Sequence, residues 1–130
     1  MSCDIEATID QRPINATIEG AIVNISGGAG GGANLPTITT LTNTTNTLTV
    51  GDISKIIRID TTSNNVTATL PTAVGNTGYI FWIKRISGGS NTATIDTTSS
   101  QTIDGQSTAV LTVQYEAIGL YSNGTNWEII

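Results

Sequence analysis

The sequence predicts an all-β fold whose body is an antiparallel β-sandwich, similar to a jelly roll. Thr occurs 24 times and Ile 19 times among the 130 residues, and β-branched side chains favour strands. Apolar and polar residues alternate along short segments, as they do in strands with one buried face. Groups of Gly, Asn, Asp and Ser separate these segments roughly every 8 to 12 residues, a spacing typical of sandwiches and barrels.

Residues 4–26 contain the first strands that the alternation predicts. A segment of this length cannot bury a core of its own. We therefore expect it to be an anchor that docks either on two further copies of itself or on a larger structure. Its candidate docking residues are the apolar positions Ile5, Ile9, Ile14, Ile18 and Ile22.

Residues 27–36 carry five glycines, a composition that behaves as a flexible linker. They separate the anchor at 1–26 from the body at 37–130. The single cysteine, Cys3, lies near the N-terminus, so the body has to fold without an internal disulfide.

The body is expected to contain nine strands and no helix. They span residues 38–42, 47–50, 55–61, 66–70, 79–86, 92–96, 108–113, 116–122 and 126–130. The clearest hairpin is the last, because Asn123 and Gly124 can supply the positive-φ pair of a type I′ turn. A loop of three to five residues is also compatible with the residues there.

The strand at 79–86 is apolar on both faces. Tyr79, Phe81 and Ile83 point to one side, and Ile80, Trp82 and Ile86 to the other. Such a strand is either central in a sandwich or turned with one face toward another subunit. The candidate trimer-interface residues are Tyr79, Phe81, Trp82 and Ile83.

The residue inventory excludes several kinds of chemistry. The chain has no His and one Cys, which rules out Ser/His, Cys/His and His-based metal sites. Paired carboxylates such as Asp96 and Asp104 can hydrolyse glycosidic bonds, but about 95 residues rarely form the long groove this needs. We therefore expect no enzymatic activity and no catalytic residue.

Metal and nucleic-acid binding are also not expected. Asp60 and Asp96 occupy matching pentapeptides, Ile-Asp-Thr-Thr-Ser, which could indicate calcium ligands. An Asp at a strand end more often caps the following turn through its own carboxylate, so we expect neither a metal nor a cofactor. The net charge is −5 and the five basic residues are scattered, which argues against a nucleic-acid partner.

The few aromatic residues have two interpretations. Trp82 and Trp127 offer the largest apolar surface in the chain, which favours core or interface positions. Trp and Tyr rings also stack on sugars, and Tyr121 and Trp127 are the candidate contacts for a host-surface glycan. The first residues lack a signal-peptide pattern and no long apolar run follows, so we expect neither classical export nor membrane insertion.

Several segments resemble the β-rich modules of bacteriophage tail-fibre and head-fibre proteins, and together they cover about residues 50–130. They are Ile57-Arg58-Ile59-Asp60, Val66 to Pro71, Gly78 to Lys84, Thr102 to Gly105, Leu111 to Glu116 and Ser122 to Trp127. The resemblance implies a homotrimer, made in the host cytoplasm and exposed on the virion, that docks on capsid or tail proteins through residues 4–26.

The chain departs from long fibres, because it has no extended shaft, collagen-like run or trailing chaperone domain. Three alternatives therefore stay open. The alternatives are a capsid decoration protein without a receptor role, a glycan-binding adhesin module, and a module of a bacterial surface or pilus protein.

Overall fold

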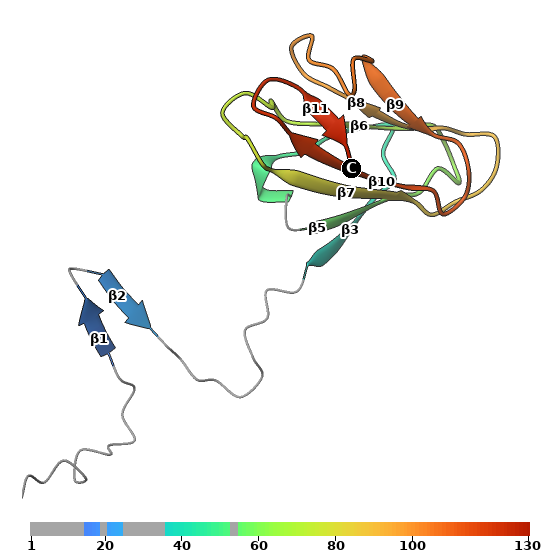
Figure 1. Ribbon diagram of the computed structural model, residues 1–130. Helices are drawn as coiled ribbons and strands as arrows, with labels where there is room; N and C mark the ends of the chain where they lie inside the picture. The colour runs from blue at the N-terminus through green and yellow to red at the C-terminus, as the bar shows by residue number, and fades with distance from the viewer. Residues whose placement is uncertain (1–14, 19–20, 25–35, 53–54) are drawn as a thin grey trace, which may run out of the picture. The chain divides into compact units, whose positions relative to one another are not determined.

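The computed structural model describes residues 15–18, 21–24, 36–52 and 55–130. The chain divides into two units, Met1–Asn34 and Leu35–Ile130, with the boundary inside the segment 27–36. The described residues form strands and a single 3-10 turn, which confirms the all-β prediction (Figure 1). No helix in the described residues is long and apolar enough to cross a membrane.

The first unit contains an antiparallel hairpin of β1 (Asn15–Ile18) and β2 (Ala21–Asn24). The predicted anchor residues Ile18 and Ile22 lie in these strands. The other predicted anchor residues, Ile5, Ile9 and Ile14, lie outside the described residues, as do Cys3 and residues 27–35 of the predicted linker.

The described residues of the second unit form nine strands, and each overlaps one predicted strand. They are β3 (Thr37–Leu41), β4 (Thr45–Thr47), β5 (Lys55–Ile59), β6 (Val66–Thr69), β7 (Ile80–Arg85), β8 (Ala93–Asp96), β9 (Thr108–Leu111), β10 (Ala117–Ser122) and β11 (Trp127–Ile129).

The largest difference from the predicted strands lies after β4. The prediction extends this strand to residue 50, but Val50–Asp52 form a 3-10 turn. The carboxylate of Asp52 accepts hydrogen bonds from the backbone NH of Thr49 (2.8 Å) and from its hydroxyl (3.0 Å), which ends the strand.

The final hairpin has the longer of the two predicted loops. Residues 123–126 connect β10 to β11, and the NH of Asn123 donates to the carbonyl of Asn126 at 3.0 Å. The side chain of Asn123 accepts the NH groups of Thr125 and Asn126, so the side chain closes a four-residue turn. Gly124 provides the positive φ inside it.

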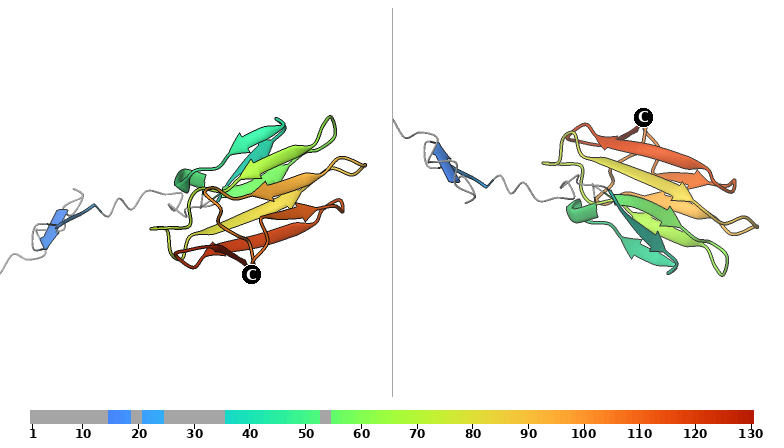
Figure 2. Two further views of the ribbon diagram at one scale, coloured as in Figure 1. Left: turned by 90° about the horizontal axis from the view of Figure 1, so that it is seen from above. Right: turned by 90° about the horizontal axis from the view of Figure 1, so that it is seen from below.

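The strands form two sheets, with the orders β11-β10-β7-β5-β3 and β4-β6-β8-β9 (Figure 2). From β3 to β8 the chain alternates between the sheets, and each of the strands β5 to β8 pairs in parallel with the strand two places earlier. The chain of the body therefore winds as a coil, and each turn of the coil contributes one strand to each sheet. Antiparallel pairs occur only where β9, β10 and β11 complete the two sheets.

The predicted antiparallel arrangement is therefore wrong for the pairs that the first six strands of the body form with one another. Alternation in the sequence reports that one face of a strand is buried, but it does not report the direction of the neighbouring strand. Because consecutive strands here belong to different sheets, each strand meets its neighbour only after a full turn of the coil.

Apolar side chains from both sheets form one buried cluster. Its two largest members, Phe81 and Trp127, pack edge to face with ring centres 5.5 Å apart and an interplanar angle of 66°. The indole NH of Trp127 donates to the carbonyl of Pro71 at 3.2 Å, so the buried polar atom of this side chain is satisfied.

Arg85 is buried at the end of β7, although its guanidinium carries a charge. It donates to four backbone carbonyls, those of Ser87 (2.8 Å), Gly89 (3.0 Å), Leu111 (3.0 Å) and Thr112 (2.6 Å). These bonds connect β7 and the loop that follows it to the end of β9. The side chain thus joins the two sheets at one end of the body.

Candidate functional site

The candidate site is the outer face of the five-stranded sheet, which points away from the core. Along β7 the side chains alternate strictly, with Phe81, Ile83 and Arg85 buried and Ile80 and Trp82 exposed. This alternation confirms that the strand has two apolar faces. Only one of the two faces is covered by the body itself.

The centre of the outer face is an apolar row that runs across the strands. Ile38 on β3 lies opposite Ile56 on β5, which lies opposite Trp82 on β7, which lies opposite Gly119 on β10. Ile38 is 61% exposed and Trp82 is 51% exposed. We call Ile38, Ile56 and Trp82 the apolar row.

Gly119 has no side chain and leaves room for the indole of Trp82 to lie against the sheet. A Cβ at position 119 would lie 2.5 Å from Cζ3 of Trp82 and 3.0 Å from Cε3 and Cη2. Because these three atoms belong to the six-membered ring, that ring covers the backbone of Gly119. A large aromatic surface therefore lies against the sheet while half of the side chain stays open to solvent.

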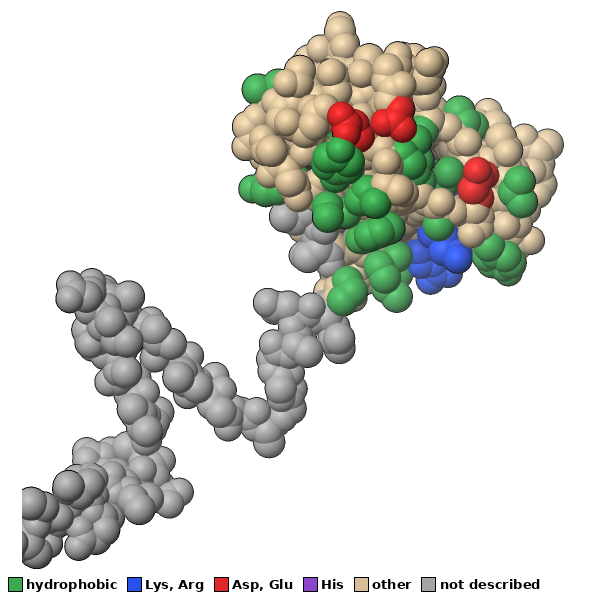
Figure 3. Space-filling view, viewed as in Figure 1, with side chains coloured by type: hydrophobic (Ala, Val, Ile, Leu, Met, Phe, Trp, Pro, Cys, Tyr) green, Lys and Arg blue, Asp and Glu red, His purple; other side chains and the backbone are tan. Residues whose placement is uncertain are grey.

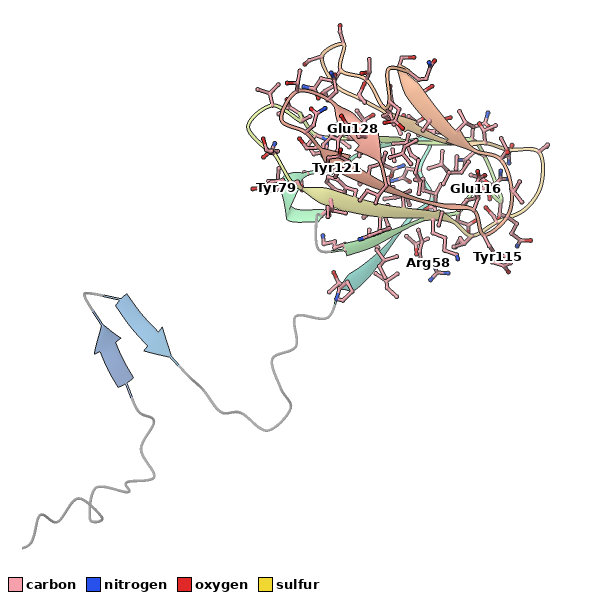
Figure 4. All side chains as sticks on the ribbon, in the orientation of Figure 1. Arg58, Tyr79, Tyr115, Glu116, Tyr121 and Glu128 are labelled. Carbon is pink, nitrogen blue, oxygen red and sulfur yellow. The ribbon has the colours of Figure 1, made fainter. Side chains whose placement is uncertain are left out.

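A cationic row lies on one side of the apolar row. Arg58 on β5 and Lys84 on β7 lie opposite each other, two residues along their strands from Ile56 and Trp82. The ammonium of Lys84 lies 5.8 Å from the ring centre of Tyr115. Figure 4 shows Arg58, Tyr115 and Glu116 at the same end of the body.

The two cations form no ion pair with the described residues. The single ion pair found there joins Lys55 to Asp52. Glu116 is nearby, but one of its carboxylate oxygens accepts the NH groups of Thr112 (2.7 Å) and Val113 (3.0 Å). The two basic side chains therefore carry charge that the described part of the chain does not neutralise by direct contact.

On the other side of the apolar row lies a row with one carboxylate, that of Glu128, which we call the acidic row. Tyr121 on β10 lies opposite Ile80 on one side and Glu128 on the other. The Tyr121 hydroxyl donates to one carboxylate oxygen of Glu128, and the amide of Asn123 donates to the other at 2.6 Å.

These contacts change the acidity of both partners. The hydrogen bond to Glu128 raises the pKa of Tyr121 above its ordinary value, and desolvation and the nearby charges of Glu128 and Asp104 act in the same direction. The hydrogen bonds from Tyr121 and Asn123 lower the pKa of Glu128, against a smaller opposing effect of desolvation. Glu128 is therefore a carboxylate at neutral pH.

The outer face is thus banded by charge. Neighbouring rows are two residues apart along the strands, or about 7 Å, so the cationic and acidic rows lie about 13 Å apart. Figure 3 shows hydrophobic side chains gathered on this face, with acidic side chains above them, basic ones to the right, and further acidic atoms just above the basic ones.

The structure separates the predicted interface residues. Phe81 and Ile83 belong to the core and cannot contact another subunit, which corrects that prediction, because they lie on the inward face of β7. Tyr79 is partly buried and packs against the core. Trp82 lies on the outer face, where its role at an interface stays a prediction.

The two predicted glycan contacts also differ. Trp127 has no exposed surface, so it cannot stack on a sugar, and its prediction as a surface contact is corrected. Tyr121 lies on the outer face, half-buried and hydrogen-bonded to Glu128. The hydroxyl of Tyr121 therefore already has a partner, whereas stacking on a sugar would use its ring.

The sequence did not indicate the rest of the outer face. Ile38, Ile56 and Gly119 join Trp82 only because distant strands pair in the register described above. In residues 55–61 the alternation puts Ile56 on the opposite face of the strand from Ile57 and Ile59. This is the one feature of the sequence that indicates a position for Ile56 on the outer face. It could not identify the neighbours of Ile56 in the sheet.

The carboxylates of the two Ile-Asp-Thr-Thr-Ser pentapeptides accept hydrogen bonds from the residues that follow them. Asp60 accepts hydrogen bonds from the hydroxyl (2.6 Å) and NH (2.9 Å) of Thr62, which lower its pKa. Asp96 accepts the NH of Thr97 at 2.8 Å. Among the described residues no group of three or more His, Cys, Asp or Glu side chains could hold a metal ion.

Comparisons with known proteins add no relative. No model of a known protein family matches the sequence, and no curated protein matches it.

Proposed function

We propose that the chain is a structural protein of a bacteriophage particle. In this proposal it is a short homotrimeric fibre or spike, attached to the capsid or tail through residues 4–26 and exposed on the outside of the virion. The body then presents itself to the host surface and contributes to attachment. It performs no catalysis.

The observation that carries the proposal is the uncovered apolar row, in which Ile56 connects the exposed side chains of Ile38 and Trp82 across three neighbouring strands. Ile38 is 61% exposed and Trp82 is 51% exposed, with Ile56 between them, and association with another subunit would remove this apolar surface from water. The resemblance of residues 50–130 to phage fibre modules supplies the setting, because such modules associate as trimers.

The proposal keeps the predicted jelly-roll-like sandwich as the fold of the body, but without its fully antiparallel strand arrangement. The two sheets share one core, as in a sandwich, although most of their strands run parallel. A body closed by two sheets in this way would act as a rigid knob on the particle.

A glycan-binding adhesin is the second candidate, and the position of Trp82 favours it. An indole ring that lies over a backbone and leaves its surface open to solvent is suited to stacking on a sugar ring. The adhesin would use Trp82 and Tyr121 on the same outer face. A decoration protein without a receptor role would use neither.

Particle composition tests the proposed function. Virions purified from cells that express the gene are digested and examined by mass spectrometry, and antibodies against residues 36–130 are used to label intact particles in the electron microscope. We expect the protein in purified virions at a fixed copy number, with label on the exterior. Its absence from them would overturn the proposal.

A truncation tests the anchor. A chain that lacks residues 1–30 is expected to retain the β-type circular dichroism of the body but not to enter particles. A matched control, the full chain with Val110→Ala on β9, should enter particles normally. Incorporation of the truncated chain would show that the attachment lies in the body.

A further inference from the structure

We propose that Arg58, Lys84 and Tyr115 form a site for an acidic sugar of a host-surface polysaccharide. The sugar ring stacks on Tyr115, and its carboxylate accepts hydrogen bonds from Arg58 and Lys84. This inference rests on the proposed contribution to host attachment, and it adds the class of ligand and the residues that bind it. The site lies on one flank of the apolar row, so a subunit contact centred on that row does not use it.

The two cations of the site lie where like charges repel each other. Arg58 on β5 is directly opposite Lys84 on β7. Neighbouring strands are about 5 Å apart, and like charges at directly opposite positions destabilise a sheet. Neither cation has an ion-pair partner among the described residues. A carboxylate has two oxygens that could each accept a hydrogen bond from one of the cations, which would offset the repulsion.

The backbone of Tyr115 is also locally unfavourable. Its φ is 69°, in the left-handed region that bulky residues rarely adopt and that glycine adopts without strain. Backbone groups close the turn, since the NH of Tyr115 donates to the carbonyl of Arg85 at 3.0 Å and the NH of Glu116 donates to that of Val113 at 3.2 Å. A glycine could form both bonds, so the turn itself gives no reason for an aromatic side chain at this position.

The ring of Tyr115 is open to solvent beside the cations. The residue is 62% exposed, and the ammonium of Lys84 lies 5.8 Å from the ring centre. Tyr115 and Arg58 lie at the same end of the body (Figure 4). Exposed aromatic rings can stack on the apolar face of a sugar. Two locally unfavourable features, the opposed cations and the strained aromatic residue, therefore occur together, which is typical of functional sites.

The charges around the site favour a weakly charged ligand. Asp60 follows Arg58 by two residues, and Glu116 is next to Tyr115 in the sequence. In each carboxylate, one oxygen accepts hydrogen bonds from nearby residues of the same segment. These carboxylates and the net charge of −5 would repel a nucleic acid, which carries a phosphate at every nucleotide. An acidic sugar carries one charge among neutral hydroxyls, and Thr40, opposite Arg58 in the sheet and exposed, offers a hydroxyl of its own.

The test is the binding of the full-length protein to immobilised oligosaccharides, measured by biolayer interferometry. The panel contains oligomers of galacturonic acid, oligomers of sialic acid and hyaluronan fragments, each beside its methyl ester, in which the carboxyl group is neutral. We expect binding to at least one of the acids, and binding to the corresponding ester that is weaker by roughly tenfold or more. Added salt should weaken binding to the acid.

Tyr115→Gly separates binding from folding. The variant should bind the acidic oligosaccharide roughly tenfold more weakly, because it lacks the ring. Its thermal midpoint should stay the same or rise, because glycine adopts the left-handed conformation without strain. Tyr115→Phe keeps the ring and should retain the affinity of the wild type.

Neutral variants test the two cations. Arg58→Gln and Lys84→Gln should each weaken binding to the acidic oligosaccharide by roughly tenfold. Lys55→Gln is the matched control, because it removes the same charge from the chain at a residue that is paired with Asp52. This control should leave the affinity unchanged.

Three results would overturn the site. They are no binding to any acidic oligosaccharide of the panel, equal binding to the acids and their esters, and a Tyr115→Gly variant that binds as tightly as the wild type. Tighter binding to a single-stranded oligothymidine than to the sugars would also overturn it, in favour of a nucleic-acid surface. A protein that binds the acidic sugar but is absent from virions would instead remove the proposed function and leave the site intact.

Discussion

The six-membered ring of Trp82 lies over the backbone of Gly119, its partner on the neighbouring strand β10. Gly119 does not have a positive φ, so the reason for glycine here is space and not backbone conformation. The absence of a side chain at position 119 allows the indole to lie flat on the sheet. The shape of the outer face therefore depends on a residue with no side chain.

Gly119→Ala is expected to move the ring of Trp82 away from the sheet, because the added Cβ would lie 2.5 Å from Cζ3. The ring is exposed and can move, so the free energy of unfolding should fall by only about 1 kcal/mol or less. Acrylamide quenching of Trp fluorescence checks the movement and should increase. Ala117→Ser, on the outward side of the same strand, is the control and should leave quenching unchanged.

Arg85→Met should destabilise the body by about 3 kcal/mol or more, since it leaves four buried or partly buried carbonyls without their donor. Urea unfolding at a fixed protein concentration measures the change. Lys55→Met removes the ion pair with Asp52 at 2.6 Å near the surface and should cost less than about 1 kcal/mol. Equal effects of the two substitutions would contradict the role of Arg85.

The positions of the strands could be predicted because they depend on local pattern. Phe81 and Ile83 alternate with Ile80 and Trp82 within one strand, so two faces were visible in the sequence before any partner was known. The order of the strands depends on pairs far apart in the chain. Ile56 lies opposite Trp82, and nothing near either residue indicates this.

The burial of Arg85 illustrates the same limit. In the sequence it follows Lys84, and charged side chains of this kind are rarely buried. The side chain of Arg85 instead points inward, because it lies on the same face of β7 as Phe81 and Ile83. Its burial is tolerated because backbone carbonyls after β7 and at the end of β9 accept its hydrogen bonds. The phase could be predicted, but the four acceptors could not.

Trp127→Ala is expected to lower the free energy of unfolding by roughly 3–5 kcal/mol, because it removes the largest fully buried side chain and its edge contact with Phe81. Thermal unfolding followed by circular dichroism measures the loss. Trp82→Ala serves as the comparison and should cost much less for folding of a single chain, since half of that side chain is already exposed. A small effect at Trp127 would mean that the core tolerates its loss.

The pair of Tyr121 and Glu128 should make stability depend on pH at both ends of the range. Glu128 has a lowered pKa in the folded state, so its contribution is present above the ordinary value of 4.5 and is lost as the pH falls through the folded pKa. Tyr121 has a raised pKa, so its contribution is present below 10.0 and is lost as the pH rises through the folded pKa. The difference in thermal midpoint between the wild type and Tyr121→Phe should therefore be largest between these limits and shrink toward both. Other titrating groups, such as Asp52 and Asp60, are common to both proteins and cancel in the difference. A difference that stays constant from acid to alkaline pH would show that the hydrogen bond does not stabilise the ionised carboxylate.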